Sequence, residues 1–242
     1  MAPMYDGDRV SEADASMSTA LIGAELESRI ASNLFASLAS AARHDQPYRN
    51  WRLQGVFPEP VARELAALPF GPVELGGVSG RRELHNDARQ YFAAEVLDAH
   101  PVAREVAQGF QSPAVVRAFA EATGANLDGT YVRIEYAVDQ DGFWLEPHTD
   151  LGVKALTLLT QLPAEGQEDL GTDIYGGPGD WRERSAFEWN GALLFIPSDR
   201  TWHGFERRPI RGIRRTVIVN YVTEEWRARE QLAFPQSPVT SR

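Results

Sequence analysis

The spacing of hydrophobic positions changes near residue 125, and this change predicts two kinds of structure. Before it, apolar residues recur three or four positions apart, which is typical of amphipathic helices. Proline in a first turn and glycine after a last turn mark where such helices begin and end. The predicted helices are 20–42, 58–68 and 93–124, the last in two pieces broken at Pro101 and around Ser112-Pro113 and ending at Gly124.

Beyond Thr130, short runs of β-branched and aromatic residues are separated by clusters of Gly, Pro and Asp, which is typical of strands and turns. One earlier run, 51–57, also has the character of a short strand. Helices followed by a β-rich region predict an α+β fold, with the helices packed against one sheet. The predicted later strands are 131–137, 155–162, 173–175, 192–196 and 214–222.

The composition fits one globular domain. The chain has 242 residues, 43% of them hydrophobic, and no low-complexity tract. Residues 1–18 are dominated by Asp, Glu, Ser, Ala and Gly without periodicity, so we expect a disordered N-terminus there. We expect a single domain over 19–242, in which 19–125 is mainly helical support and 126–225 is the β core.

Charge and composition exclude several function classes. A net charge of -10 argues against a surface that tracks nucleic-acid phosphates. No apolar run approaches the ~20 residues of a membrane span, and the acidic N-terminus is not a secretory signal. Without cysteine, disulfides and thiolate metal sites are impossible. We therefore expect a cytoplasmic protein that binds neither nucleic acid nor membrane, with an oligomeric state that the sequence leaves open.

Candidate chemistry centres on His148-Thr149-Asp150 and on His203. Two imidazoles and one carboxylate on one side of a metal leave the opposite positions open. His148 and Asp150 are two residues apart, so on a strand they would share one face. We expect His203 to reach the ion from the other sheet. Such nitrogen and oxygen ligands suit iron, and equally Zn, Mn, Co and Ni.

The order of strands, His-x-Asp, distal His and a following Arg-rich strand resembles the 2-oxoglutarate- and Fe(II)-dependent oxygenase superfamily, in its prolyl-hydroxylase-like branch. The resemblance covers residues 130–225. It implies a double-stranded β-helix (a cupin-like jelly roll) braced by the N-terminal helices. It further implies that His148, Asp150 and His203 are the catalytic Fe(II) ligands, with 2-oxoglutarate and O2 as cosubstrates. The implied reaction hydroxylates an unactivated C–H bond and releases succinate and CO2.

The cosubstrate is expected to bind along the strand 214–222. Arg214 is the candidate for its distal carboxylate, since a guanidinium is a planar fork that matches a carboxylate. Alternation places Thr216 on the same face, where the resemblance implies an assisting hydroxyl. Arg215 is the rival, because one residue of register would exchange the two arginines. Tyr136 corresponds to a cosubstrate-contacting aromatic of the family, or else packs in the barrel.

Other residues have weaker assignments. Thr157 and Gln161 would face the same interior. Phe143 and Trp144 either line the substrate mouth or belong to the core, and Trp202 is expected to steer His203. The polar segment 81–87 is a substrate-contact loop or a solvated helix start.

Asp150 occupies the position that halogenating relatives leave to a small residue, so hydroxylation is preferred to halogenation, while desaturation, cyclisation and epimerisation stay open. The compact chain favours a small-molecule substrate, amino-acid-like or a secondary metabolite, by family analogy alone. Two alternatives remain. One is a cupin-like metal-dependent isomerase or hydrolase, which would have no need of Arg214 beside Thr216. The other is a non-catalytic ligand-sensing barrel.

Overall fold

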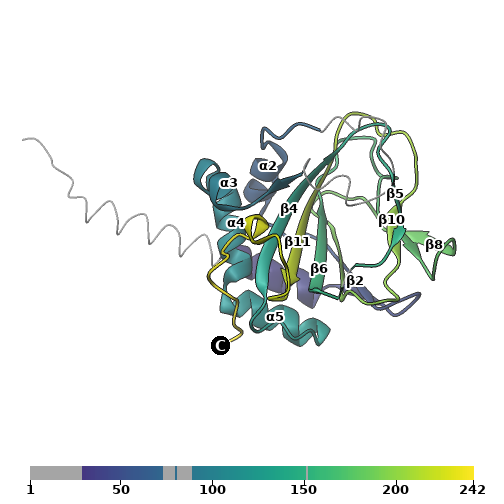
Figure 1. Ribbon diagram of the computed structural model, residues 1–242. Coiled ribbons are helices and arrows are strands. Elements are labelled where there is room, and N and C mark those ends of the chain that lie inside the picture. The colour runs from purple at the N-terminus through teal and green to yellow at the C-terminus, as the bar shows by residue number, and fades with distance from the viewer. Residues whose placement is uncertain (1–28, 73–79, 81–88, 151) are drawn as a thin grey trace, which may run out of the picture.

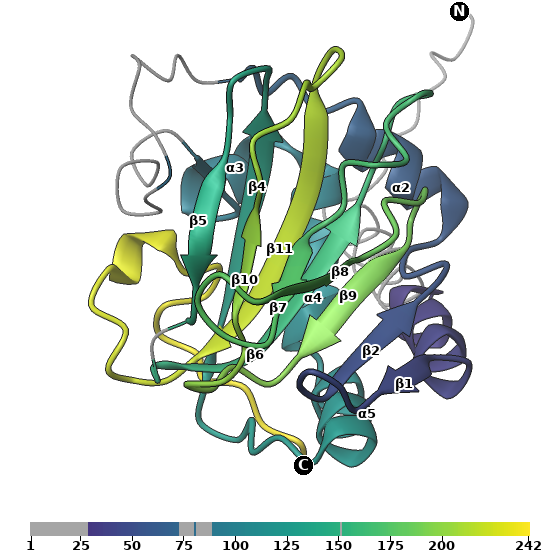
Figure 2. The same cartoon turned by 90° about the vertical axis from the view of Figure 1, so that its right-hand side faces the viewer.

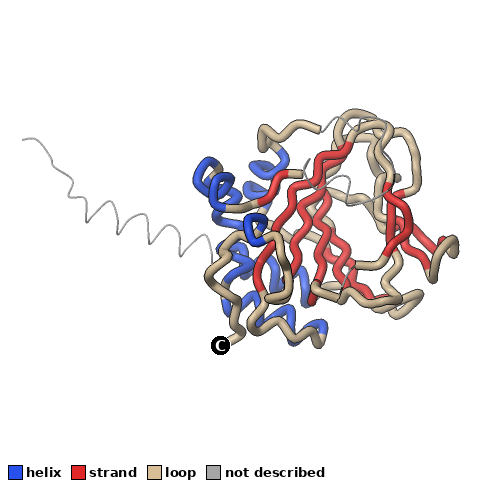
Figure 3. Tube along the Cα trace, in the orientation of Figure 1, coloured by secondary structure: helices blue, strands red, loops and turns tan. Residues whose placement is uncertain are grey.

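A computed structural model describes residues 29–72, 80, 89–150 and 152–242. Its helices gather on one face of the larger of two sheets (Figures 1 and 3). No described helix is long and apolar enough to cross a membrane. The expected disordered stretch 1–18 and the polar segment 81–87 lie outside the described residues. The helices are 29–39, α2 (Glu59–Ala66), α3 (Ala94–Ala99), α4 (Pro101–Gln111), α5 (Pro113–Thr123) and the 3-10 helix η2 (Arg229–Gln231).

The predicted helical stretch 93–124 forms three helices, not two. His100, with φ -129° and ψ 100°, has an extended backbone that separates α3 from α4. A residue before proline avoids the helical region for steric reasons, and here Pro101 follows it. Ser112 ends α4 and accepts a hydrogen bond from the amide of Val115 at the start of α5. Gly124, with φ 81°, ends α5 in the left-handed conformation, as its position in the sequence predicts.

The larger sheet has seven strands in the order β1-β2-β9-β6-β11-β4-β3, and every neighbouring pair is antiparallel. Its two longest strands, β4 and β11, pair over their full length, from Arg214↔Asp139 to Val222↔Tyr131. Its strands are β1 (Ala42–His44), β2 (Asn50–Leu53), β3 (Gln90–Tyr91), β4 (Tyr131–Asp139), β6 (Lys154–Gln161), β9 (Ala192–Phe195) and β11 (Arg214–Val222).

The smaller sheet has four antiparallel strands in the order β5-β10-β7-β8 and lies opposite the larger one (Figure 2). From β4 to β11 the chain passes between the two sheets repeatedly, and only β7 and β8 are consecutive in one sheet. The space between the sheets therefore receives side chains from strands far apart in the sequence. The strands are β5 (Leu145–His148), β7 (Asp173–Tyr175), β8 (Trp181–Arg184) and β10 (His203–Phe205).

The two faces of the larger sheet have different environments. Alternate residues of β4 and β11, such as Ile134, Val217 and Val219, pack against the helices in the main hydrophobic core. Tyr221 belongs to this face, and its hydroxyl donates a hydrogen bond to the Phe110 carbonyl at 2.7 Å. The opposite face carries a smaller apolar cluster together with buried polar groups. This inner face forms one wall of the candidate site.

Strands 173–175 and 214–222 have the predicted bounds, and the other predicted strands differ by up to four residues at their ends, most at the end of 51–57. The strands that the hydrophobic pattern did not predict are β1, β3, β5, β8 and β10, each of two to four residues. Such runs are too short for a periodicity to develop. Two of them, β5 and β10, carry the two candidate histidine ligands.

Candidate metal centre and its cavity

Two strand ends bring the candidate metal ligands together. His148 is the last residue of β5 and His203 is the first residue of β10, and the two pair directly in the small sheet. Their ring centroids are 4.4 Å apart. Asp150 follows two residues after His148, and one potential ligand atom from each of the three residues lies within 4.8 Å of the others. These distances fit three ligands of a single metal ion.

The position of His203 corrects one expectation from the sequence. His203 lies in the same sheet as His148, not in the opposite one. Between Asp150 and His203, which are 53 positions apart, the chain leaves the small sheet for β6, returns for β7 and β8, leaves again for β9 and returns with β10. The sequence separation alone does not say how many times the chain crosses between the sheets, so it could not decide in which sheet His203 lies.

Backbone carbonyls orient both imidazoles. Nδ1 of His148 lies 2.9 Å from the Glu146 carbonyl oxygen, and Nδ1 of His203 lies 2.9 Å from that of Thr201. A carbonyl can only accept, so each Nδ1 carries the proton and each Nε2 keeps the lone pair that a metal requires. The backbone therefore selects the same tautomer for both histidines.

The carboxylate of Asp150 is held at both oxygens. Lys154 Nζ lies 2.6 Å from Oδ1, and Thr157 donates to Oδ2 at 3.3 Å. Asn220 in turn donates to the Thr157 hydroxyl at 2.9 Å. Both side chains of the Lys154–Asp150 pair are at most 5% exposed, so the ammonium balances a buried negative charge. The residues around Asp150 thereby fix its direction toward the two imidazoles.

A buried polar chain continues from Asn220 across the inner face of the larger sheet. Arg133 donates from Nη1 to Asn220 at 3.0 Å and from Nη2 to Glu135 at 2.9 Å. Glu135, which is fully buried, also forms an ion pair with Arg89. Burial opposes the charged form of Arg89, but the charges of Glu135 and Asp139 outweigh it and raise its pKa. These contacts connect the side of the interior near Asp150 to the side near Arg89.

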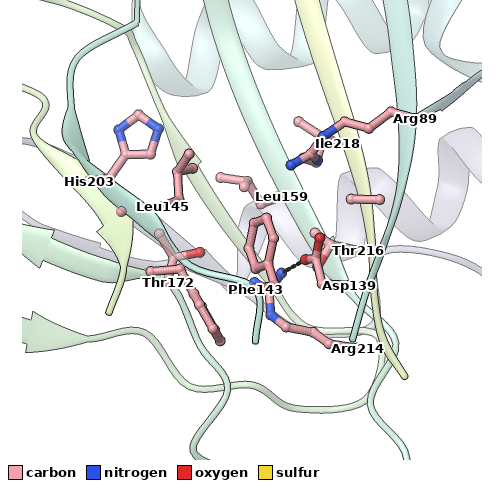
Figure 4. A pocket seen from close by; sticks show the side chains of 13 residues that line it. Arg89, Asp139, Phe143, Leu145, Leu159, Thr172, His203, Arg214, Thr216 and Ile218 are labelled. Carbon is pink, nitrogen blue, oxygen red and sulfur yellow. Dashed lines mark hydrogen bonds and ion pairs between the residues drawn. The ribbon is translucent and has the colours of Figure 1, made fainter. Parts of the chain in front are cut away.

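A cavity of about 50 Å³ lies between His203 and Arg214 (Figure 4). Arg214 donates from Nη1 to Asp139 at 2.6 Å and from Nε to the Leu170 carbonyl at 2.8 Å. Burial lowers the pKa of this guanidinium, and the charge of Asp139 opposes that shift. The cavity is lined by Arg89, Ala137, Asp139, Phe143, Leu145, Leu159, Thr172, His203, Gly204, Phe205, Arg214, Thr216 and Ile218.

The hydroxyl of Thr216 has no hydrogen-bond partner within the described parts of the chain, although the residue is only 1% exposed. Buried hydroxyls are normally satisfied, so an orphan of this kind calls for an explanation. Thr216 lines the cavity beside Arg214, as strand alternation predicts. A guanidinium and an unsatisfied hydroxyl on one wall fit a carboxylate ligand.

The structure places Tyr136 and Arg215 away from this cavity. Tyr136 lies on the helix-covered face, where its hydroxyl donates to the Leu65 carbonyl at 2.6 Å and burial raises its pKa to about 12. Its ring packs against Phe92 at 6.2 Å, within the main core. The charge of Arg215 acts on Tyr136, so Arg215 belongs to the same side. Of the two roles expected for Tyr136, this position fits packing within the fold and not contact with a cosubstrate, because β4 presents its odd-numbered residues to the interior.

Of the other aromatic and polar candidates, some line the cavity and others support the residues around it. Phe143 lines the cavity, with its ring 5.6 Å from that of Phe205. Trp144 does not line it and packs over Gly80, where a Cβ atom would overlap the indole. Thr157 supports Asp150, and Gln161 is buried next to Thr216 in the sheet register.

Sequence reasoning missed Arg89, Asp139 and Lys154. Lys154 lies four residues after Asp150, a spacing that could have suggested an ion pair. Asp139 pairs with Arg214 in the β4–β11 register and could have been found once that register was known. Arg89 follows the undescribed segment 81–88, and no local pattern indicates that it reaches the cavity.

No protein-family model matches this chain, and no curated protein matches it in sequence. Solved structures do. The chain is similar to a prolyl hydroxylase from Trichoplax adhaerens in complex with a hypoxia inducible factor peptide, with 14% identity over 85% of this chain and 94% of that one and a TM-score of 0.51. It is also similar to a prolyl 4-hydroxylase from Phytophthora capsici, with 10% identity over 93% of this chain and 70% of that one and a TM-score of 0.52. The resemblance to the prolyl-hydroxylase-like branch is thus confirmed at the level of the fold.

Proposed function

We propose that this protein is a 2-oxoglutarate- and Fe(II)-dependent oxygenase whose two facing sheets form a double-stranded β-helix. The proposal rests on one observation, that a candidate metal ligand and a candidate carboxylate-binding pair line the same cavity. His203 of the His148–Asp150–His203 cluster lines one part, and Arg214 with Thr216 lines another. A metal-dependent isomerase or hydrolase needs the cluster but has no use for the carboxylate-binding wall.

The donor set fits the proposed iron. Two imidazole nitrogens and one carboxylate oxygen on one side leave the remaining positions to cosubstrates, as in non-haem Fe(II) oxygenases. Bound Fe(II), with 2-oxoglutarate and O2, would supply the oxidation that converts a C–H bond to C–OH and releases succinate and CO2. The same donors also accept Zn, Mn, Co or Ni, so the carboxylate-binding wall is what favours iron.

The chain's own residues have distinct tasks in this proposal. Arg214 and Thr216 bind the distal carboxylate of 2-oxoglutarate, and Lys154 and Thr157 hold Asp150 toward the metal. Phe143 and the other apolar lining residues exclude water from the space between them. Because Asp150 supplies a carboxylate where halogenating relatives have a small residue, hydroxylation is the proposed outcome.

Domain organisation and substrate class are part of the proposal. We propose one oxygenase domain over 19–242, with the helices of 19–125 supporting a β core at 126–225. The proposed substrate is a small molecule, amino-acid-like or a secondary metabolite, by family analogy alone.

Anaerobic titration of the apo-protein with Fe(II) and 2-oxoglutarate tests the proposal through the visible charge-transfer band of the chelate. We expect the band in wild type and in His100→Ala, a histidine distant in sequence from the cluster. His203→Ala should abolish it, because one ligand is lost. Arg214→Ala should require at least tenfold more 2-oxoglutarate. The ligand would lose a charge-assisted hydrogen bond of about 1.5–3 kcal/mol and would face the carboxylate of Asp139 without its cation. Arg215→Ala should behave as wild type.

A folded, metal-loaded wild type without the band would refute the oxygenase proposal. The metal-dependent isomerase or hydrolase would then be the working hypothesis, and a protein that binds no metal at all would indicate a ligand-sensing barrel.

A further inference from the structure

A second, larger hollow lies beside the metal centre. It has a volume of about 730 Å³ and lies between the turn that joins β1 to β2 and the turn that follows β9. Asn50 of β2 pairs with Phe195 of β9, so both turns extend beyond the same end of the larger sheet. We call it the turn groove, and it is lined by Arg43, Asp45, Gln46, Pro47, Tyr48, Arg49, Trp51, Ile196, Ser198, Arg200 and Thr201.

Two contacts connect the turn groove to the metal ligands. Thr201 lines the groove, and its carbonyl accepts the hydrogen bond that orients His203. The ring of Tyr48 lies 5.9 Å from that of Phe195, which lies 5.0 Å from the ring of His203. Tyr48 also packs with the inner-face residues Leu159 and Ile218, which line the metal cavity. Tyr48 therefore stands between the turn groove and the metal centre.

The hydroxyl of Tyr48 is an unused donor. The residue is only 6% exposed, and its hydroxyl has no hydrogen-bond partner within the described residues. Burial raises the pKa of Tyr48, Arg52 opposes that shift and the carboxylates of Glu183 and Asp150 add to it, so the phenol stays protonated and able to donate. A buried hydroxyl without a partner costs free energy, and a ligand oxygen that reached it from the groove would recover that cost.

The groove is locally cationic in a chain whose net charge is -10. Arg43 and Arg49 share the single carboxylate of Asp45, at 2.8 and 3.3 Å. Arg200 adds a third guanidinium, and Asp45 is the only carboxylate among the described lining residues. Cations therefore outnumber anions, and guanidinium groups are suited to phosphate and carboxylate oxygens.

We propose that the turn groove binds an oxyanion of the substrate, a phosphate or a carboxylate, through Arg49, Arg200 and the hydroxyl of Tyr48. The substrate of the proposed oxygenase is then an anionic small molecule that lies across Tyr48 toward the metal. The link to catalysis rests on the proposed function, whereas the anion site itself does not.

Isothermal titration of the metal-free, full-length protein with inorganic phosphate, and separately with acetate, tests the anion site. Arg49→Gln and Arg200→Gln should each weaken binding about tenfold, as expected for one charge-assisted hydrogen bond. Arg63→Gln is the matched control, because Arg63 is exposed and has an i,i+4 carboxylate partner, Glu59, as Arg49 has Asp45. The tighter of the two anions identifies the ligand group. No binding to wild type, or equal binding to all variants, overturns the site.

Tyr48→Phe separates ligand binding from a structural role. The variant removes a hydroxyl that has no partner, so the free energy of unfolding should not fall. Phosphate or acetate affinity should nevertheless decrease about tenfold. A loss of stability with unchanged anion affinity would assign Tyr48 to the fold alone and overturn its part in the site.

Phosphorus relaxation in protein loaded with Mn(II) tests the link to the metal centre. Phosphate in the turn groove should relax faster when Mn(II) occupies the cluster, and His203→Ala should remove the effect. Bound Mn(II) and bound phosphate without enhanced relaxation would overturn the link. If Mn(II) does not bind, the proposed function fails, while the calorimetric result still decides the anion site.

Discussion

The guanidinium of Arg214, which the proposed cosubstrate needs, is already paired with the carboxylate of Asp139. Asp139 Oδ2 accepts from Arg214 Nη1 at 2.6 Å, and the two side chains are 6% and 7% exposed. The cavity beside them has a volume of about 50 Å³, so a diacid must displace or share this carboxylate. We predict that Asp139→Asn binds 2-oxoglutarate more tightly than wild type.

The magnitude follows from the state of Arg214 before binding. In wild type, an incoming carboxylate replaces one buried ion pair with another of the same chemistry. In Asp139→Asn, the guanidinium has lost this counter-charge, and breaking a buried pair costs about 3 kcal/mol of stability. The ligand carboxylate recovers the charge-assisted hydrogen bond, which contributes about 1.5–3 kcal/mol. At about 1.4 kcal/mol per factor of ten, the dissociation constant should fall about ten- to a hundredfold.

The assay is the anaerobic chelate titration, with Fe(II) saturating and 2-oxoglutarate varied. Asp180→Asn is the control, because Asp180 also pairs with an arginine, Arg182, but on the exposed β7–β8 turn. Its dissociation constant should match that of wild type. Thermal unfolding should show Asp139→Asn destabilised without ligand and largely restored with it. Weaker binding by Asp139→Asn would refute the reasoning and assign Asp139 to positioning Arg214.

Two further predictions test the packing role of Tyr136 on β4 and the buried carboxylate of Asp173 in the small sheet. Tyr136→Phe should lose about 1 kcal/mol of unfolding free energy with the bond to Leu65, yet keep its 2-oxoglutarate affinity; a weakened chelate would restore the cosubstrate role. Burial opposes ionisation of Asp173, but hydrogen bonds from Arg208, the Glu206 amide and Arg184 outweigh it and lower its pKa. Its stabilisation should therefore be complete above the ordinary Asp value of about 4 and be lost as the pH falls below it. Asp173→Asn should flatten that dependence in denaturant titrations, and an unchanged slope would contradict the assignment.

Much of the site followed from residue types and local spacing. Imidazole and carboxylate groups can bind a metal in any fold, so the sequence alone could identify His148, Asp150 and His203 as candidate ligands. The structure brings their ligand atoms together. The strand Arg214–Val222 is long enough for its alternation to be read directly, so Arg214 and Thr216 were assigned to one face correctly.

For Tyr136 the sequence left two roles open, cosubstrate contact and packing in the barrel. Which residues of β4 point inward depends on its register with β11, where Tyr136 pairs with Val217 and both face the helices. A one-residue difference in register reverses every side chain of a strand. The sheet that contains His203 was likewise decided by the path of the chain between β6 and β10.

The sequence by itself determined the classes of element, the breaks at Pro101 and Gly124, and the types of ligand, because backbone sterics and hydrophobic period act over a few residues. Only the tertiary structure decided what meets across the interior. The ion pairs of Arg89 with Glu135 and of Asp139 with Arg214 join residues 46 and 75 positions apart. Tyr48 and His203, which are connected through Phe195, are 155 positions apart. Their pairing is set by the register of two sheets, which is a property of the assembled fold and of no local segment.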